Sequence, residues 1–488
     1  MSSPPSQNPP PIPPDHPWAV PLSHLRHSMA ASRDGRQREA VAAALAAFKG
    51  RVGAPELLMH LAGRLLELGE VRAMYACAHD LAIQRGGNPP VVFHLANMLA
   101  SAGYPGDALQ LVRKVRAEGV DGQQVQWLAG LCFEDIGRIE DAAREFRTGL
   151  DGKDPAPLLL ALAQLPPTAV IDDEALQARL EAAVGSCAED DPQLAILLHA
   201  LFLVRDRGGQ ADTAWQALER AMALRGKHIA YDPEQDQALF DYVAGRRAAA
   251  ATGEAAPGPR PVFIVGMPGT GIEGLARQLA VHPQVADAGA LNDLVMQLRW
   301  SCDQVGGPAL DMSLAQGAAS IDFAALGRDY LAHTQWRAGD KPVFLDRNPD
   351  NYACIPWIMQ ALPGARVLHL VGGPMDTCFA NLARWSGREH GWSRDQVETA
   401  DHYRRYRALM AHMRALYPDQ IHDVRCDELA DDSGTALREA IEFCGLPWDE
   451  RFTAAAAVTG GQAMPAGRWR RYEAALAPMR QRLGALAY

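Results

Sequence analysis

The stretch that decides the fold of the second half of the chain is Pro261–Ala280, which reads PVFIVGMPGTGIEGLARQLA. Val262–Gly266 is a short apolar run of the kind that predicts a buried strand. A glycine-rich turn follows, and Ile272–Val281 has the apolar spacing of a helix. Because a strand, a glycine turn and a helix N-terminus bring backbone N–H groups together, the sequence predicts an anion-binding cradle over Gly266–Gly271.

The spacing within this turn is that of a phosphate-binding P-loop, since Gly266 and Gly271 form a GxxxxG pattern. Ile272-Glu273 stands where a nucleotide hydrolase has Lys-Ser or Lys-Thr, and Lys341 is the one lysine after residue 260. A conventional ATP or GTP hydrolase therefore does not fit. Two readings of Glu273 stay open: its carboxylate fills the cradle at the helix N-terminus, or it points to solvent.

The remainder of this half alternates between short apolar runs and helical patterns. Such alternation predicts a mostly parallel, doubly wound sheet, in which ligands bind at the carboxyl ends of the strands. The turn after the first strand is therefore the expected site. Further strands are predicted over 343–346, 366–371 and 421–425, and helices over 351–362, 374–385, 401–416 and 435–444.

The first half of the chain contains an internal repeat. Gly69, Gly103 and Gly137 lie 34 residues apart, and each ends an apolar helical stretch. This period resembles the tetratricopeptide repeat, whose helix pairs stack into a solenoid with a concave face that often holds a peptide or protein partner. A purely structural role for the solenoid stays open. The three copies are Pro55–Asn88, Pro89–Gly122 and Gln123–Ala156.

These patterns divide the chain into four parts. The parts are a disordered proline-rich tail at 1–22, tetratricopeptide-like helical repeats at 23–247, a linker at 248–260 and an α/β domain at 261–488.

Composition narrows the class of protein. The 488 residues carry 47 basic and 58 acidic side chains, a net charge of −11, which argues against a nucleic-acid or anionic-membrane partner bound through a global basic field. Local arginine clusters remain compatible with this charge. The eight cysteines form no CxxC pair, so neither a metal site nor a disulfide framework is expected. Without a signal peptide or a long apolar run, the sequence predicts a cytoplasmic protein.

Several motifs together carry a family resemblance. They are PVFIVGMPGTG, LAVHPQVADAGAL at Leu279–Leu291, LDRNP at Leu345–Pro349, FCGLPWD at Phe443–Asp449 and GRWRRYE at Gly467–Glu473. The chain resembles sulfotransferases that carry N-terminal tetratricopeptide repeats and are related to protein-tyrosine sulfotransferases. The resemblance implies an α-helical tetratricopeptide-like solenoid followed by an α/β P-loop-type sulfotransferase domain with a mostly parallel sheet.

The resemblance also implies the chemistry of the site. Members of this family transfer a sulfuryl group from 3′-phosphoadenosine-5′-phosphosulfate, as co-substrate, to a hydroxyl, which can be a protein tyrosine. It implies no metal. The residues that it assigns to donor binding are Gly266, Pro268, Gly269, Thr270, Gly271 and Arg468.

Several residues that the family uses are replaced here. Gly269 stands where the family has the loop arginine. Gly372 and Ala380 replace the arginine and the serine that bind the 3′-phosphate, and Ala290 replaces the glutamate that serves as general base. Each lost charge-assisted hydrogen bond contributes about 1.5–3 kcal/mol. Together these losses predict a donor affinity lower by roughly 10³-fold.

Two residues are candidates for the remaining chemistry. Arg347 keeps a positive charge at the position of the family's lysine, and Asp346 could replace Ala290 as a base or cap a neighbouring turn. Two hypotheses follow. One is a sulfotransferase with weakened donor contacts. The other is a non-catalytic pseudo-sulfotransferase that acts as a protein-binding scaffold through its repeats.

Overall fold

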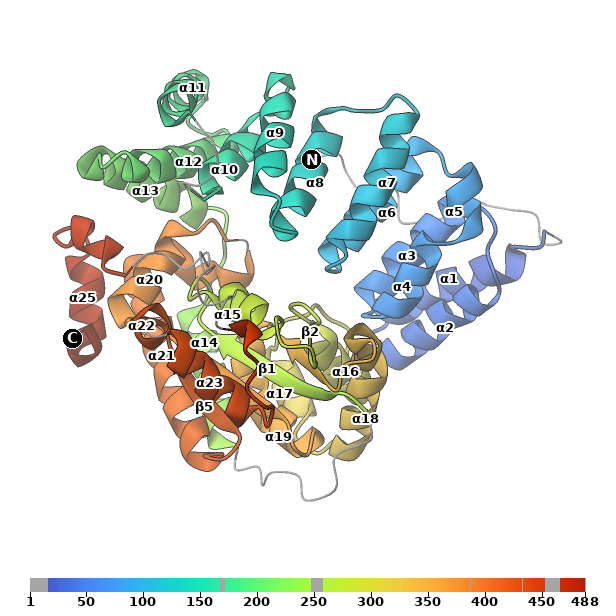
Figure 1. The fold of residues 1–488 in the computed structure, drawn as a ribbon. Helices are drawn as coiled ribbons and strands as arrows, with labels where there is room; N and C mark the ends of the chain where they lie inside the picture. Colours follow the sequence, from blue (N-terminus) through green and yellow to red (C-terminus); the bar gives the residue numbers. More distant parts are fainter. Residues whose placement is uncertain are drawn as a thin grey trace. The chain divides into compact units, whose positions relative to one another are not determined.

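A computed structural model of the chain describes residues 16–166, 172–246, 258–386, 388–431, 433–452 and 466–487. Most of the predicted proline-rich tail and most of the predicted linker lie outside these residues. The chain divides into two compact units, residues 1–171 with 296–308 and residues 172–295 with 309–488. Each unit is described by itself, with the labels of Figure 1.

The first unit is built from helices that pair along the chain (Figure 1). Three pairs begin 34 residues apart, with first helices starting at residues 55, 89 and 123 and second helices at 71, 105 and 139. The pairs are α3 (Pro55–Glu67) with α4 (Val71–Ala78), α6 (Pro89–Ser101) with α7 (Pro105–Ala117), and α8 (Gln123–Asp135) with α9 (Ile139–Thr148). The unit also contains α1 (Ala19–Arg33), α2 (Gln37–Lys49), α5 (Leu81–Gly86), η1 (Gly149–Asp151) and α10 (Ala156–Gln164).

The turn glycines explain how each pair folds back. Gly69, Gly103 and Gly137 have φ values of 84°, 87° and 79°, a left-handed conformation that glycine adopts without the penalty a Cβ brings. Each follows the end of the first helix of its pair, so the chain reverses at the same place in all three. The predicted helix–turn–helix spacing is therefore present, and a regular stack of helix pairs follows from it.

Close packing within the third pair depends on one residue without a side chain. A Cβ at Gly130 of α8 would lie 2.2 Å from the ring of Phe146 of α9, which is fully buried. The corresponding positions of the second copy hold Ala96 and Val112. In the third pair, the large ring of Phe146 is thus matched by a residue without a side chain on the partner helix.

The second unit begins with four helices. They are α11 (Asp173–Ser186), α12 (Gln193–Arg207), α13 (Ala211–Gly226) and α14 (Pro233–Gly245). The apolar run Leu194–Val204 lies in α12, and it is buried at nearly every turn rather than on one stripe. A helix that is apolar all round belongs inside a protein core, which agrees with its position here.

The rest of the second unit is organised around a five-stranded parallel sheet (Figure 1). The strand order is β2-β3-β1-β4-β5, so β1 lies at the centre. The predicted parallel sheet is confirmed, although β2 was missed because it has only three residues. The strands are β1 (Arg260–Gly266), β2 (Val285–Asp287), β3 (Val343–Asp346), β4 (Arg366–Val371) and β5 (Ile421–Arg425).

Helices cover both faces of this sheet. On one face Ile264 of β1 packs with apolar residues of α15 (Ile272–Leu279) and α23 (Ser433–Phe443). On the other face the ring of Phe263 lies 5.8 Å from that of Tyr330 in α18 (Phe323–Thr334), and Tyr406 of α21 (Gln396–Leu416) bonds to β4. Successive side chains of a strand point to opposite faces, so β1 is buried on both sides.

Shorter elements complete the second unit. The predicted helix over 351–362 is a 3₁₀ turn followed by an α-helix, because Pro356 has no N–H to continue a single helix. The helix α16 (Asp293–Cys302) is divided between the two units, since residues 296–308 belong to the first. The other elements after β2 are α17 (Met312–Gly317), η2 (Gln335–Ala338), η3 (Pro349–Cys354), α19 (Ile355–Ala361), α20 (Pro374–Ala383), η4 (Arg388–Arg394), α22 (Cys426–Asp431), η6 (Arg468–Tyr472), α25 (Ala477–Leu483) and η7 (Gly484–Ala487).

Candidate functional site

The candidate site lies at the carboxyl edge of the sheet, where the order of the strands reverses. The chain leaves β1 toward β3 on one side, and it returns through β4 on the other. The turns after β1 and β4 are therefore neighbours, and a Cβ at Gly266 would lie 2.9 Å from the carbonyl oxygen of Leu370. A crevice at such a reversal is the usual ligand site of a doubly wound sheet.

The turn after β1 is held in one conformation by hydrogen bonds. Thr270 Oγ1 donates to the carbonyl of Met267 at 2.8 Å, and the buried amide Asn381 Nδ2 donates to the carbonyl of Pro268 at 2.8 Å. Gly269 and Gly271 have φ values of 79° and 97°. The loop is therefore preorganised by its own hydroxyl and by an amide from α20.

The N-terminus of α15 leaves donors at the end of this loop. The N–H groups of Gly274 and Leu275 both bond to the carbonyl of Gly271, at 2.9 and 3.1 Å, and these bonds begin the helix. The N–H groups of Ile272 and Glu273 precede them and have no intrahelical acceptor. The predicted anion cradle thus has its backbone donors, but the Glu273 carboxylate adds a negative charge in the first turn.

The three positions at which the resemblance predicts replaced donor contacts lie around this loop. A Cβ at Gly269 would lie 3.4 Å from the Cβ of Ala380. A Cβ at Gly372 would lie 2.6 Å from Thr377 Oγ1 and 3.6 Å from Thr270 Cγ2. Positions far apart in the sequence are therefore brought together, and the space next to Gly372 is already occupied by the Thr377 hydroxyl.

Asp346 is fully buried at the end of β3. Its Oδ2 accepts a hydrogen bond from Tyr330 Oη at 2.9 Å, and its Oδ1 accepts from the backbone N–H groups of Leu291 and Asn348, both at 3.2 Å. Burial raises the pKa of this carboxyl to about 7. These contacts match the turn-capping alternative, and a carboxylate with no exposed surface has no path to a substrate hydroxyl.

Arg347 lies next to Asp346 but faces another way. Its Nε is 3.2 and 3.3 Å from the two carboxylate oxygens of Asp287 at the end of β2, and its side chain is 28% exposed. The backbone N–H of Arg347 donates to the carbonyl of Gly289 at 3.0 Å, one residue before the exposed Ala290. Arg347 is therefore near the expected position of the general base, with its charge already paired.

Arg468 is engaged by a buried carboxylate. It forms an ion pair with Asp206 of α12, which also accepts a hydrogen bond from Tyr472 Oη at 2.6 Å. The side chain of Asp206 is only 1% exposed. The neighbouring Gly467 N–H donates to Asp376 Oδ1 of α20 at 2.6 Å. The predicted donor contact of Arg468 stays a prediction, while the structure gives this arginine a partner of its own.

Three residues that shape the site were not singled out from the sequence. Asn381 fixes the loop after β1, Thr377 fills the space beside Gly372, and Tyr330 holds Asp346. The position of Asn381 could have been predicted from the sequence, because residues four apart, such as Thr377 and Asn381, lie on the same face of a helix. The role of Tyr330 could not, since its partner is fixed only by tertiary packing.

Within the described ranges, no group of three or more His, Cys, Asp or Glu side chains is arranged to hold a metal ion. None of the described helices combines the length and the apolar character that crossing a bilayer requires.

Comparison with known proteins assigns this segment to a class. Residues 261–450 match the model of the sulfotransferase family. This part of the chain, which contains the loop after β1 and all of the sheet except Arg260, is therefore similar to a sulfotransferase-family domain.

Individual relatives are more distant. An uncharacterized protein of Aquifex aeolicus (strain VF5) is 25% identical over 294 residues, which cover 57% of this chain and 38% of that protein. The match thus spans well under half of the relative. A sulfotransferase from Alicyclobacillus acidocaldarius is 15% identical, with 48% of this chain and 96% of that one covered and a TM-score of 0.29. A sulfotransferase from Mycobacterium tuberculosis H37Rv is 14% identical, with 64% and 99% covered and a TM-score of 0.28.

Proposed function

We propose that the domain over residues 261–450 is a sulfotransferase that takes a donor of the 3′-phosphoadenosine-5′-phosphosulfate class at the loop Gly266–Gly271. The sulfuryl group passes to a hydroxyl of the acceptor, for which the family resemblance favours a protein tyrosine. The observation that carries the proposal is the strand–turn–helix geometry, which leaves the N–H groups of Ile272 and Glu273 available for a phosphate.

The affinity for this donor is weakened by the residues around the loop. Gly269, Gly372 and Ala380 offer no charged or hydroxyl side chain to a phosphate, so more of the binding falls on the backbone N–H groups. Glu273 adds a negative charge in the first turn of α15. At a separation of about 4 Å and an effective dielectric constant near 20, two like charges repel by roughly 4 kcal/mol.

The first unit has a proposed role as well. Its helix pairs are tetratricopeptide-type repeats that form a solenoid and hold a peptide or protein partner. The constant 34-residue step of the helix starts and the left-handed turn glycines support this assignment. The scattered cysteines, free where the structure describes them, support a reducing, cytoplasmic setting.

A second candidate function has its own support. Asp346 is enclosed, Ala290 cannot accept a proton, and Arg347 is paired with Asp287. Among the described residues, none of these three candidates supplies an accessible base or a free cation, which fits a non-catalytic pseudo-sulfotransferase that acts as a scaffold through its repeats. The two candidates differ in whether the loop binds nucleotide at all.

Calorimetric titration with 3′-phosphoadenosine-5′-phosphate separates them. For the enzyme we expect saturable binding with a Kd between about 10 μM and 1 mM. The Glu273→Gln variant removes the carboxylate while keeping its shape, and it should bind at least tenfold more tightly. Glu442→Gln, on the exposed face of α23, makes the same charge change away from the loop and should bind like the unaltered protein.

The titration also has outcomes that would contradict the enzyme proposal. If the unaltered protein and Glu273→Gln are both folded by circular dichroism and neither gives heat at millimolar nucleotide, the donor site does not exist and the scaffold function stands. If Glu442→Gln improves binding as much as Glu273→Gln, the effect belongs to the overall charge rather than to the loop.

A further inference from the structure

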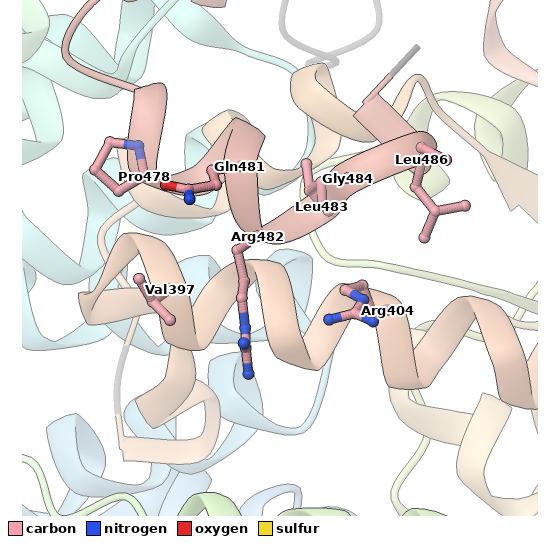
Figure 2. Close-up of a pocket in the computed structure, with 9 residues that line it drawn as sticks. Val397, Arg404, Pro478, Gln481, Arg482, Leu483, Gly484 and Leu486 are labelled. Atoms are coloured by element: carbon pink, nitrogen blue, oxygen red, sulfur yellow. The ribbon is translucent and has the colours of Figure 1, made fainter.

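A long hollow lies on the surface of the second unit, away from the loop after β1. One cavity of about 670 Å³ is formed by α21, α25 and η7, and a second of about 650 Å³ continues it along α21. The two share Arg404, Arg482 and Leu486, so they form one continuous groove. Figure 2 shows Arg482 reaching from the C-terminal segment toward α21, between Val397 and Arg404.

The floor of this groove is one face of α21. Val397, Arg404, Ala408 and Ala411 recur at intervals of seven, four and three residues, which places them on a single face of a helix. The opposite face of α21 is buried in the domain, where Tyr406 bonds to His369. The exposed face spans roughly 20 Å at 1.5 Å per residue.

The groove carries an excess of positive charge. Its charged lining consists of four arginines and the carboxylate of Asp401, and one of these arginines, Arg405, is already paired with Asp236 at 2.8 Å. Arg482 Nε lies 2.5 Å from Asp401 Oδ1, and Arg404 lies 3.8 Å from the same oxygen, with half of each arginine side chain exposed. One carboxylate thus serves two guanidinium groups. The arginines are Arg404, Arg405, Arg407 and Arg482.

Apolar residues line the groove beside these charges. Val397 is 39% exposed and Leu486 is 38% exposed, so both belong to the large apolar side chains that the structure describes as exposed. Both line the hollow rather than project from a convex surface, so they fit a chain lying in the groove better than a membrane. A small anion would use one arginine pair and leave the apolar residues uncovered.

We propose that this groove, lined by Val397, Arg404, Arg405, Arg407, Arg482 and Leu486, binds an extended segment of a protein partner in which acidic and apolar residues alternate. A segment of about six residues, at roughly 3.3 Å each, matches the length of the groove. Its carboxylates would meet guanidinium groups in the geometry that arginine favours, and its apolar side chains would cover Val397 and Leu486. The proposal does not rest on sulfuryl transfer, since no residue of the loop after β1 lines the groove.

Fluorescence anisotropy with a labelled peptide of repeated Glu-Leu-Glu-Gly tests this inference on the full chain. We expect micromolar binding that weakens as salt is raised, and no binding of the peptide with lysine in place of glutamate. Arg404→Glu and Ala408→Glu should each weaken binding at least tenfold. Arg328→Glu, an equal charge change on the exposed side of α18, should leave it unchanged.

Three results would overturn the inference. The first is no peptide binding by the unaltered protein. The second is equal binding by Arg404→Glu and Arg328→Glu when both are folded by circular dichroism. The third is binding of phosphatidylserine vesicles, lost in Arg404→Glu, without binding of the peptide, which would assign the groove to a membrane surface. Nucleotide titration of Arg404→Glu should match the unaltered protein, so failure here is distinguishable from failure at the donor loop.

Discussion

At the scale of single residues, Gly372 shows that the space beside the proposed donor loop is already occupied. The family's arginine would have to begin with a Cβ 2.6 Å from Thr377 Oγ1, closer than two such atoms can approach. Thr377 is itself buried, so it cannot simply turn away into solvent. Restoring one side chain therefore does not restore the site.

This packing gives a first prediction. Gly372→Arg should lower the free energy of unfolding by about 1–3 kcal/mol, as overpacking of a buried site does, and should not improve nucleotide binding. Urea denaturation and calorimetric titration measure the two effects.

The double variant Gly372→Arg with Thr377→Ala is the matched comparison. Removing the hydroxyl should recover most of the lost stability and raise nucleotide affinity. A single Gly372→Arg variant that is as stable as the unaltered protein would show that the space beside Gly372 is open.

Asp346 gives a prediction about pH. Its pKa is raised to about 7 by burial, whereas an unfolded aspartate titrates near its ordinary value of 3.8. The folded state therefore holds this proton more tightly than the unfolded state. Protonated Asp346 therefore contributes to the free energy of unfolding, on the order of 4 kcal/mol. This contribution is fully present below about pH 4 and is lost as the pH rises through 7.

Asp346→Asn should remove this part of the pH dependence. The amide oxygen can still accept from the backbone N–H groups of Leu291 and Asn348, so the turn is kept. Relative to the unaltered protein, the variant should gain stability between pH 4 and pH 8 in urea unfolding. A difference between the two proteins that does not change with pH would contradict the raised pKa.

At the scale of elements, the fit between α8 and α9 depends on Gly130. Gly130→Ala places a methyl group 2.2 Å from the ring of Phe146, and the overpacking should exceed the gain in helix propensity. We expect a loss of about 1–2 kcal/mol in the free energy of unfolding.

Gly106→Ala in α7 is the control for this change. A Cβ at Gly106 meets no atom within 4 Å, so the variant should be within about 0.5 kcal/mol of the unaltered protein. Thermal or urea unfolding followed by circular dichroism compares the two. Equal stabilities would show that the pair is packed loosely.

Local pattern was enough to predict most elements of the second half. The strands over 343–346, 366–371 and 421–425 were predicted with the bounds that the structure has. They are short apolar runs between turn residues, a signal that needs no tertiary information. β2 was missed because three residues at the edge of a sheet carry too little periodicity to distinguish a strand from a loop.

At the scale of the whole molecule, the second unit is held together by a carboxylate far from its partners in sequence. Asp206 of α12 pairs with Arg468 and accepts the hydroxyl of Tyr472, and the backbone carbonyl of Asp206 accepts from Arg471 at 3.0 Å. The motif GRWRRYE thus anchors the C-terminal segment to the helical part of the unit.

Asp206→Ala should therefore cost about 3–5 kcal/mol, because it leaves the largely buried Arg468 and the buried Tyr472 hydroxyl without their partner. Asp190→Ala, at an exposed position between α11 and α12, should cost no more than about 0.5 kcal/mol. Urea unfolding compares them. Similar stabilities for the two variants would mean that the cluster around Asp206 is solvated in solution.

The sequence by itself determined the parallel sheet, the glycine turn after its first strand and the 34-residue step of the helix pairs. Each of these depends on neighbours within a few residues, through hydrophobic period, backbone freedom and turn chemistry. Only the tertiary structure decided which charges are left for a ligand. Asp346 is taken up by Tyr330, Arg347 by Asp287 and Arg468 by Asp206. Ion pairs and buried hydrogen bonds form between distant residues according to burial, which no local pattern encodes.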